Sequence, residues 1–154
     1  MSAKTGHLDE MDERILDELR RNGRISVTEL SRKVNLSKTP CQNRIRRLEE
    51  DGYILGYRAV VDPHRLGLPH VAFVEVRLSD TRKAALDAFN KAVRALPEVE
   101  QAHMIASSFD YLLKVRTKDI AAYREVLGEK ISALPHVSNT STHVSMEAVK
   151  DESE

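Results

Sequence analysis

The sequence predicts an α+β protein with an N-terminal three-helix (winged) helix-turn-helix domain and a C-terminal ferredoxin-like βαββαβ sandwich. Apolar residues recur at helical spacing in the first fifty residues, and short capping sequences separate them. Strand and helix patterns alternate from about residue 70 onward. The segment Ala95–Val99 (ALPEV) is echoed at Ala133–Val137 (ALPHV), each time where an expected helix leads into an expected strand. Two such strand–helix–strand units are what a split βαβ sandwich requires.

The first two helices follow from apolar spacing and from one capping sequence. Leu8, Met11, Ile15 and Leu19 are three and four residues apart, as in one apolar stripe of an amphipathic helix. The segment Ser26–Glu29 reads Ser-Val-Thr-Glu, a capping box in which serine and glutamate side chains bond to free amides of the first turn. A second helix is therefore expected to begin there.

A third helix is expected from Ser37, its N-cap, to Glu50. Asn35 tolerates the left-handed conformation that lets the chain leave the second helix. Pro40 falls in the first turn, where a missing amide hydrogen has no intrahelical partner to lose. At about 100° per residue, the apolar side of this helix consists of Cys41, Ile45 and Leu48.

The outer face of the third helix is polar and basic, which suits the DNA major groove. A short helix, a turn and a second helix form a helix-turn-helix, whose second helix enters that groove. Arginine bonds to guanine, asparagine and glutamine bond to adenine, and lysine and serine hold phosphates. The alternative is a plain three-helix bundle with a solvated third helix. The predicted DNA-binding residues are Ser37, Lys38, Thr39, Gln42, Asn43, Arg44, Arg46 and Arg47.

Charge is segregated along the chain although its net charge is zero. From Arg20 to Arg47 there are nine basic residues and one acid, Glu29. A merely solvated surface would mix the two signs more evenly. Double-stranded DNA is therefore the expected partner of this segment.

Composition argues against several other classes of protein. Cys41 is the single cysteine, so neither an internal disulfide nor a CxxC zinc site can form, and its thiol is expected in the helix seam. The six histidines lack ligand-like spacing, and no metal or catalytic residue is expected. No apolar run is long enough for a membrane span, and the polar start is no signal peptide. We expect a cytoplasmic, nucleoid-associated protein.

The second half begins after a short strand-like stretch, Tyr57–Val61. The expected domains are 1–60 for DNA binding, 61–69 as a linker with two prolines and a glycine, 70–150 as the sandwich and 151–154 as a tail. β-Branched content and alternation predict the strands Val71–Leu78, Val99–Ala106, Phe109–Arg116 and Val137–Val149.

One face of the expected sheet carries both helices, and the other still holds apolar residues. The first strand directs Val71 and Phe73 to that uncovered face, and the third strand adds Leu112. A sheet usually hides such groups against something. Homodimerisation is therefore expected, and it would also place two reading helices at a fixed separation, as a palindromic operator demands.

These motifs together resemble the Lrp/AsnC (feast/famine) family of transcriptional regulators, most closely its leucine-responsive branch. The resemblance runs from about Leu8 to Lys150. It is carried by LDEMDERILDELRRNGRIS, LSKTPCQNRIRRLEEDGYILGY, FDYLLKVRT and MEAVK. It implies a transcriptional regulator of amino-acid metabolism, with an N-terminal DNA-binding domain and a C-terminal RAM (regulation of amino-acid metabolism) domain. The resemblance also implies homodimers that assemble into octamers or larger rings. It implies no cofactor.

The resemblance further implies an amino-acid effector bound between RAM domains, with leucine, proline or another apolar amino acid as candidates. Asp110 matches the acidic residue that family members offer to the ligand's ammonium group. Ser107 stands where glycine is common and His143 where an aromatic residue is frequent, so effector identity stays open; an ordinary hairpin turn is the alternative. The implied effector residues are Met104, Ile105, Ser107, Ser108, Phe109, Asp110, Tyr111, Thr142, His143 and Val144.

Two other functions remain open at this point. Sirohaem decarboxylases resemble the same two-domain architecture, although an enzyme has no reason to keep the basic face formed by Asn43, Arg46 and Arg47. The other alternative is an amino-acid-sensing module whose helix-turn-helix no longer binds DNA.

Overall fold

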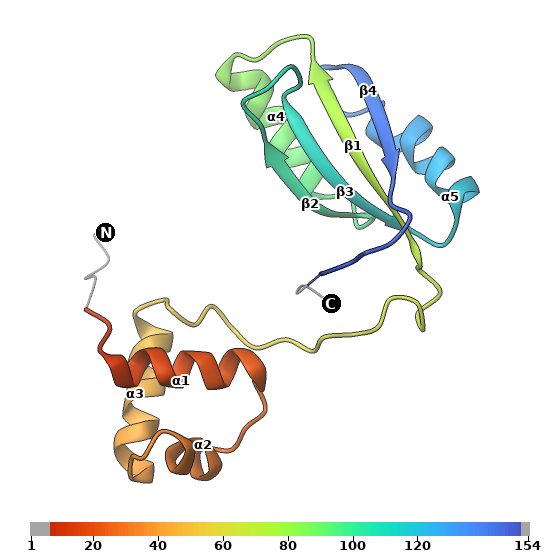
Figure 1. Ribbon diagram of the computed structural model, residues 1–154. Helices are drawn as coiled ribbons and strands as arrows, with labels where there is room; N and C mark the ends of the chain where they lie inside the picture. Colours follow the sequence, from red (N-terminus) through yellow and green to blue (C-terminus); the bar gives the residue numbers. More distant parts are fainter. Residues whose placement is uncertain (1–6, 152–154) are drawn as a thin grey trace. The chain divides into compact units, whose positions relative to one another are not determined.

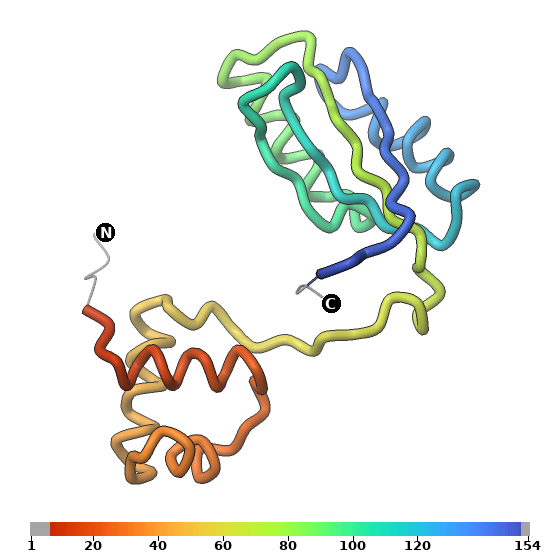
Figure 2. The backbone as a smooth tube through the Cα atoms, in the orientation of Figure 1, coloured from red at the N-terminus to blue at the C-terminus, as the bar shows by residue number. Residues whose placement is uncertain are grey.

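A computed structural model describes residues 7–151 of the 154-residue chain. The chain divides into two compact units between Ala59 and Val60, and each unit has its own hydrophobic core (Figures 1 and 2). None of the helices in the described range is both long and apolar enough to cross a bilayer.

The N-terminal unit consists of three helices, as predicted. They are α1 (Glu10–Arg21), α2 (Val27–Lys33) and α3 (Lys38–Glu50). The short turn between α2 and α3 makes them the expected helix-turn-helix. The fully or almost fully buried core of this unit consists of Ile15, Leu30, Val34, Cys41 and Leu48.

Side chains cap the first two helices. Asp9 and Asp12 form a capping box at the start of α1, which the sequence reasoning did not anticipate. The hydroxyl of Ser26 accepts a hydrogen bond of 3.1 Å from the amide of Glu29, as the sequence predicted for one half of the second box. Each such bond satisfies an amide that has no partner within its own helix.

The turn into α3 confirms one expectation and corrects another. Asn35 adopts the left-handed conformation with φ of 56°. Ser37 occupies the N-cap position, but its hydroxyl makes no capping hydrogen bond. An N-cap side chain accepts from the second or third helical amide, and the third is Pro40, which has no N–H.

The strand-like stretch Tyr57–Val61 does not form a strand. Residues 54–69 contain no helix or strand in the described chain. An extended segment becomes a strand when a neighbour completes its ladder of hydrogen bonds, and no described segment pairs with 57–61.

The C-terminal unit has the predicted ferredoxin-like order of elements. The four antiparallel strands lie in the order β2-β3-β1-β4, and both helices cover one face of the sheet (Figure 1). A π-helical turn extends α5, with the Ser132 amide donating to the Leu127 carbonyl at 2.9 Å. The elements are β1 (His70–Leu78), α4 (Lys83–Arg94), β2 (Val99–Met104), β3 (Tyr111–Thr117), α5 (Ile120–Glu125), η1 (Val126–Ile131) and β4 (Val137–Val144).

The last strand is shorter than predicted, ending at Val144 instead of Val149. Its neighbour β1 begins at His70, and the amide of Ser145 makes the final bond, 2.9 Å, to the carbonyl of Val71. β1 continues to His70, but beyond Ser145 no described residue of this segment is in a strand. The hairpin between β2 and β3 is likewise longer than expected, because β2 ends at Met104 and β3 begins at Tyr111.

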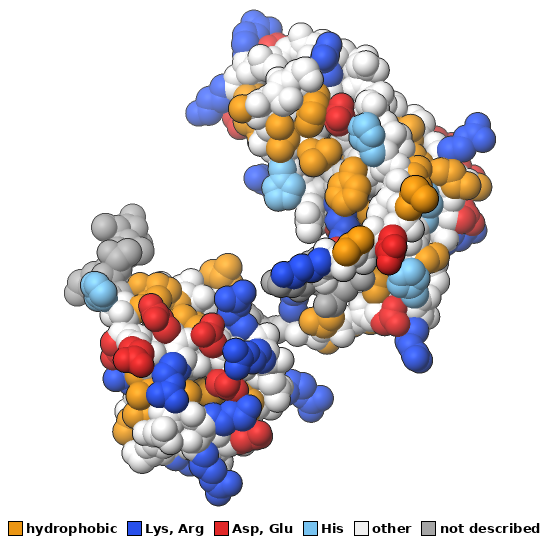
Figure 3. All heavy atoms as spheres, in the orientation of Figure 1, with side chains coloured by type: hydrophobic (Ala, Val, Ile, Leu, Met, Phe, Trp, Pro, Cys, Tyr) orange, Lys and Arg blue, Asp and Glu red, His pale blue; other side chains and the backbone are white. Residues whose placement is uncertain are grey.

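The two faces of the sheet differ in burial. The side chains of Val74, Val76 and Leu113 are completely buried beneath the helices, together with Phe89 of α4. On the uncovered face, which carries no helix, hydrophobic side chains gather among histidine and acidic ones (Figure 3). At one end of this face Lys114 is buried and hydrogen-bonded to Asp151 of the C-terminal segment. Phe73 is 37% exposed there, although its strand neighbours Ala72 and Val74 are completely buried.

Truncating the core aromatic should destabilise the C-terminal unit. We expect Phe89→Ala to lower its free energy of unfolding by about 3–5 kcal/mol, because a fully buried ring leaves a cavity. Leu66→Ala, at a residue that is 63% exposed, is the matched control. Urea unfolding followed by circular dichroism measures both, and equal losses would contradict the placement of Phe89.

Candidate DNA interface and effector loop

The third helix presents most of the predicted DNA-binding residues to solvent. Seven of the eight are exposed, and Arg44 is half-buried. The apolar side of α3 is held by Cys41 and Leu48, which are almost completely buried. This burial fixes which side of the helix faces outward.

An ion-pair network joins α3 to α1. The carboxylate of Asp12, a residue with no exposed surface, accepts hydrogen bonds from Arg44 Nη1 at 2.8 Å and from Arg47 Nη2. Asp9 Oδ2 accepts a second bond from Arg44 Nη1 at 2.6 Å. A buried carboxylate is tolerated when it is paired and hydrogen-bonded, so Asp12 holds two arginines of the predicted reading helix against α1.

The same network shifts two pKa values. The hydrogen bond from Arg44 is the main cause that lowers the pKa of Asp9 below its usual 3.8. The bonds to Asp9 and then Asp12 raise the pKa of Arg44 above its usual value. Because the folded-state pKa of Asp9 is depressed, its contribution to stability is present at neutral pH and is lost as pH falls below about 4.

Arg46 and Lys38 differ from Arg44 and Arg47. Neither side chain forms a hydrogen bond or ion pair with another of the residues 7–151, and both are exposed. The side chain of Arg47 is 50% exposed despite its pair with Asp12, whereas that of Arg44 is 29% exposed. The basic surface therefore contains unpaired cations beside paired ones, and Figure 3 shows acidic side chains among the basic ones on this unit.

The hairpin between β2 and β3 is fastened to the end of β1. Asp110 Oδ2 accepts a hydrogen bond of 2.7 Å from the amide of Leu78, and the Asp110 amide donates to the Val76 carbonyl at 2.9 Å. Arg77 Nη2 donates to the Ser108 carbonyl at 2.6 Å. The second oxygen of Asp110 accepts no bond from the described residues. One carboxylate oxygen thus positions the hairpin, and the other is available to a cation.

Two of the residues implied for effector binding have side chains that make contacts within the subunit. Tyr111 is almost completely buried, with its ring 4.3 Å from that of Phe89 and its hydroxyl donating to Asn90 at 2.8 Å. Thr142 is hydrogen-bonded to the hydroxyl of Tyr123. Their side chains serve the core. The more accessible members of the predicted set are Met104, Ser107, Ser108, His143 and Val144, with Ile105, Phe109 and Asp110 half-buried.

The two predicted effector segments lie apart within one subunit. The hairpin adjoins the end of β1, where Val76 pairs with Tyr111, whereas Thr142, His143 and Val144 pair with the opposite half of that strand. Strand order also puts β1 and β3 between β4 and β2. No group of three or more histidine, cysteine, aspartate or glutamate side chains in residues 7–151 could hold a metal ion.

Fold and surface together define a DNA-binding protein with a separate ligand-binding unit. The family model for winged helix-turn-helix DNA-binding domains matches residues 8–54. The model for the Lrp/AsnC ligand-binding domain matches residues 71–154, more than half of the chain. The chain therefore belongs to the Lrp/AsnC family of transcriptional regulators.

Similar proteins agree with this assignment. A proline dehydrogenase transcriptional activator of Rhizobium radiobacter is 62% identical over 97% of this chain and 96% of its own length. A leucine-responsive regulatory protein of Escherichia coli is 48% identical over 93% of this chain and 87% of its own length. A crystal structure of a Neisseria meningitidis transcriptional regulator in complex with L-methionine is 30% identical, with a TM-score of 0.89 and 94% of each chain covered.

These relatives decide between the functions left open by the sequence. The chain is a DNA-binding transcriptional regulator with an Lrp/AsnC ligand-binding domain and not an enzyme, which excludes the sirohaem-decarboxylase reading. The amino-acid-sensing module without DNA binding is disfavoured for the same reason.

Neutralising the buried carboxylate should destabilise the N-terminal unit. Asp12→Asn keeps the shape of the side chain but removes the charge that faces Arg44 and Arg47, so we expect a loss of about 1–3 kcal/mol in free energy of unfolding. Asp17→Asn, an exposed change on the same helix, is the control. Thermal unfolding measures both, and an unchanged midpoint for Asp12→Asn would show that the network does not hold α3.

Proposed function

We propose that this protein activates transcription of a proline dehydrogenase gene in response to proline or a similar apolar amino acid. The observation that carries the proposal is the 62% identity, over nearly the whole chain, to proteins named proline dehydrogenase transcriptional activator in Rhizobium radiobacter and Rhodobacter capsulatus. The relative bound to L-methionine supports an amino acid as the class of ligand.

We assign a separate function to each of the two units. Residues 1–60 bind DNA, 61–69 link, 70–150 bind the effector and assemble, and 151–154 form a tail. We place the protein in the cytoplasm, associated with the nucleoid, because its proposed partner is chromosomal DNA.

In the DNA-binding unit, unpaired and paired cations take different roles. Arg46, which has no partner among the described residues, reads a base edge, and Lys38 at the start of α3 holds a phosphate. Arg47 shares its guanidinium between Asp12 and the DNA, while Arg44 mainly positions the helix. The remaining proposed contacts are Ser37, Thr39, Gln42 and Asn43, all of them exposed.

The second unit is proposed to form a homodimer through its uncovered face, and octamers or larger assemblies from such dimers. Phe73 is 37% exposed at the centre of that face, between the half-buried Val71 and Leu112 on the same side of the sheet. Burying such a patch against a second copy is favourable. The dimer then presents two reading helices to the two halves of an operator.

The effector is proposed to bind where the hairpin of one copy meets another copy. Within one subunit the hairpin and the end of β4 are too far apart in the sheet to form a single pocket. The free oxygen of Asp110 takes the ammonium group, and Met104 and Phe109 contact the apolar side chain. An amino acid that binds one assembly state better than another shifts the population and therefore operator occupancy.

The direct test is to recover bound genomic DNA in the absence and presence of single amino acids. The proposal predicts enrichment of DNA upstream of a proline dehydrogenase gene and a change in occupancy with L-proline. A response to L-leucine alone would place the protein with the leucine-responsive relatives instead. A lack of sequence-selective recovery would contradict the proposal.

The variants Arg46→Ala and Lys38→Ala should weaken DNA binding in different ways. Arg46→Ala should weaken binding to the selected operator by about 1–3 kcal/mol and relax preference at one base pair. Lys38→Ala should weaken all DNA sequences alike and reduce the slope of log affinity against log salt by about 1. Binding titrations at several salt concentrations distinguish the two, and identical behaviour of the variants would reject the assigned roles.

Asp110→Asn should abolish the amino-acid response while preserving the hairpin. The amide oxygen of asparagine still accepts the hydrogen bond from Leu78, but the charge that attracts an ammonium group is gone. Asp110→Ala removes both functions and shows the cost of losing the hairpin contact. Operator affinity with and without L-proline measures the response; a normal response in Asp110→Asn would remove this residue from the effector site.

A further inference from the structure

The effector site proposed above has partners for the ammonium group and the side chain of an amino acid, but none for its carboxylate. None of the implied effector residues is a lysine or an arginine. His143 is a histidine, but its Nε2 lies 3.2 Å from Glu75 Oε1, so a positive charge on its ring already faces a carboxylate. A carboxylate that loses water on binding needs a charged or hydrogen-bonding partner. A cation beside the hairpin would therefore complete the site.

Arg77, near the end of β1, is such a cation. Its Nη2 donates a hydrogen bond of 2.6 Å to the carbonyl of Ser108 in the hairpin. Its other N–H groups form no hydrogen bond or ion pair with residues 7–151, and the residue is exposed. A guanidinium group carries five N–H donors in a planar fork. One donor thus fixes Arg77 to the hairpin, and the remaining donors are available to a ligand.

A common set of hydrogen bonds holds Arg77 and Asp110 in place. Leu78 follows Arg77 in the chain, and its amide donates to Asp110 Oδ2 at 2.7 Å. The Asp110 amide donates to the Val76 carbonyl at 2.9 Å, and the Ile105 amide donates to the Asp110 carbonyl at 2.8 Å. The pairing of β1 with β4 also changes register between Arg77 and Leu78, an irregularity that can redirect a side chain. One short segment therefore positions two opposite charges.

These two charges do not neutralise one another within the subunit. No ion pair joins Arg77 to Asp110 in the part of the chain that the structure describes. Arg77 is bonded at Ser108, and Ser108 and Asp110 are two residues apart, which corresponds to at most about 7 Å of backbone. An α-amino acid carries both of its charges next to one carbon atom. It can therefore bond to both groups at once, through charge-assisted hydrogen bonds of about 2.8 Å.

We propose that Arg77 binds the carboxylate of the amino-acid effector while Asp110 binds its ammonium group, so that the hairpin selects α-amino acids over their uncharged amides and over simple amines. The inference rests on the effector function proposed above. A planar guanidinium forms two parallel hydrogen bonds with a carboxylate. An amide with the same apolar body has no negative charge and a single acceptor oxygen, so it loses this contact.

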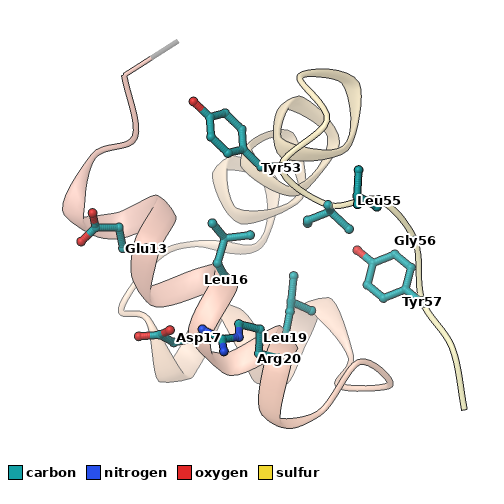
Figure 4. A pocket seen from close by; sticks show the side chains of 10 residues that line it. Glu13, Leu16, Asp17, Leu19, Arg20, Tyr53, Leu55, Gly56 and Tyr57 are labelled. Carbon is teal, nitrogen blue, oxygen red and sulfur yellow. The ribbon is translucent and has the colours of Figure 1, made fainter. Parts of the chain in front are cut away.

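A cavity in the N-terminal unit also has both charges at its border, but they are less well placed. The cavity has a volume of about 490 Å³, and its lining includes Glu13, Asp17 and Arg20 of α1 (Figure 4). All three residues are exposed, and their side chains form no hydrogen bond with residues 7–151. Binding costs less when the partner groups are already held in place. The hairpin with Arg77 and Asp110 is therefore the better site for an amino acid.

The test compares amino acids with their amides. Calorimetric titrations of the full-length protein use L-proline, L-prolinamide, L-leucine and L-leucinamide at mildly acidic pH, where the α-amino groups stay charged. They are made with the wild type, Arg77→Gln, Arg77→Lys and Arg20→Gln. Arg20→Gln is the matched control, because Arg20 is likewise an exposed arginine without a partner among the described residues but lines the other cavity.

The measured quantity is the ratio of the affinity for an amino acid to the affinity for its amide. The wild type and Arg20→Gln should prefer the effector amino acid on the order of 10- to 100-fold, as expected for a hydrogen bond between charged groups. In Arg77→Gln the ratio should fall to within about twofold of one. Arg77→Lys keeps the charge but not the fork, and should retain part of the preference. A hairpin that was merely loosened would bind both ligands less tightly and leave the ratio unchanged.

The contrary results have different meanings. If the wild type does not distinguish acid from amide, or if Arg77→Gln keeps the wild-type ratio, the role of Arg77 is overturned while the effector function stands. If Arg20→Gln loses the ratio instead, the amino acid occupies the cavity of the N-terminal unit, which also overturns the inference. A preference that depends on Arg77 for L-leucine, without binding of L-proline, supports Arg77 and removes proline from the proposed function. If the wild type binds neither amino acid, the proposed effectors and the inference fall together.

Discussion

The buried carboxylate of Asp12 is the constraint on which the DNA-binding unit depends. It closes the capping box of α1 and also accepts hydrogen bonds from Arg44 and Arg47 of α3. A buried charge is costly unless it is fully paired. The side chain of Asp12 therefore both caps the start of α1 and orients α3. The outward direction of Arg46 follows from that orientation together with the buried seam at Cys41 and Leu48.

In the C-terminal unit, the hairpin between β2 and β3, which we propose as the effector loop, is held in place by the end of β1. The hairpin depends on the main chain of β1, because Asp110 bonds to the amides and carbonyls at the end of that strand. The hairpin and the end of β4 lie at opposite ends of β1. In the proposed function, this unit responds to an amino acid through contacts between copies of the chain.

Periodicity and local rules were enough to predict the element order, the helix-turn-helix and the sandwich. These predictions used local signals: the amphipathic stripes, the capping serine at Ser26 and the repeated Ala-Leu-Pro segments. Asn35 adopts the left-handed conformation that asparagine tolerates better than most residues. Pairing between distant elements was not predictable. The partner of Asp12 lies more than thirty residues away, the expected strand at Tyr57–Val61 has no neighbour among the described residues, and β4 ends at Val144 although its neighbour β1 continues to His70. Ser37 occupies its predicted N-cap position but makes no side-chain capping bond, and the sequence shows that Pro40 supplies no amide at the third helical position.

If Asp12 orients the reading surface of α3, its neutralisation should lower the specificity of DNA binding, and the ratio of operator affinity to random-duplex affinity in a folded variant measures this most directly. Asp12→Asn would be titrated with the selected operator and with random duplex at a temperature where circular dichroism shows the native helix content. We expect the ratio of the two affinities to fall towards one, because Arg46 and Arg47 keep their charge but are no longer held in their orientation. A ratio equal to that of the wild type, in a variant that is folded, would contradict it.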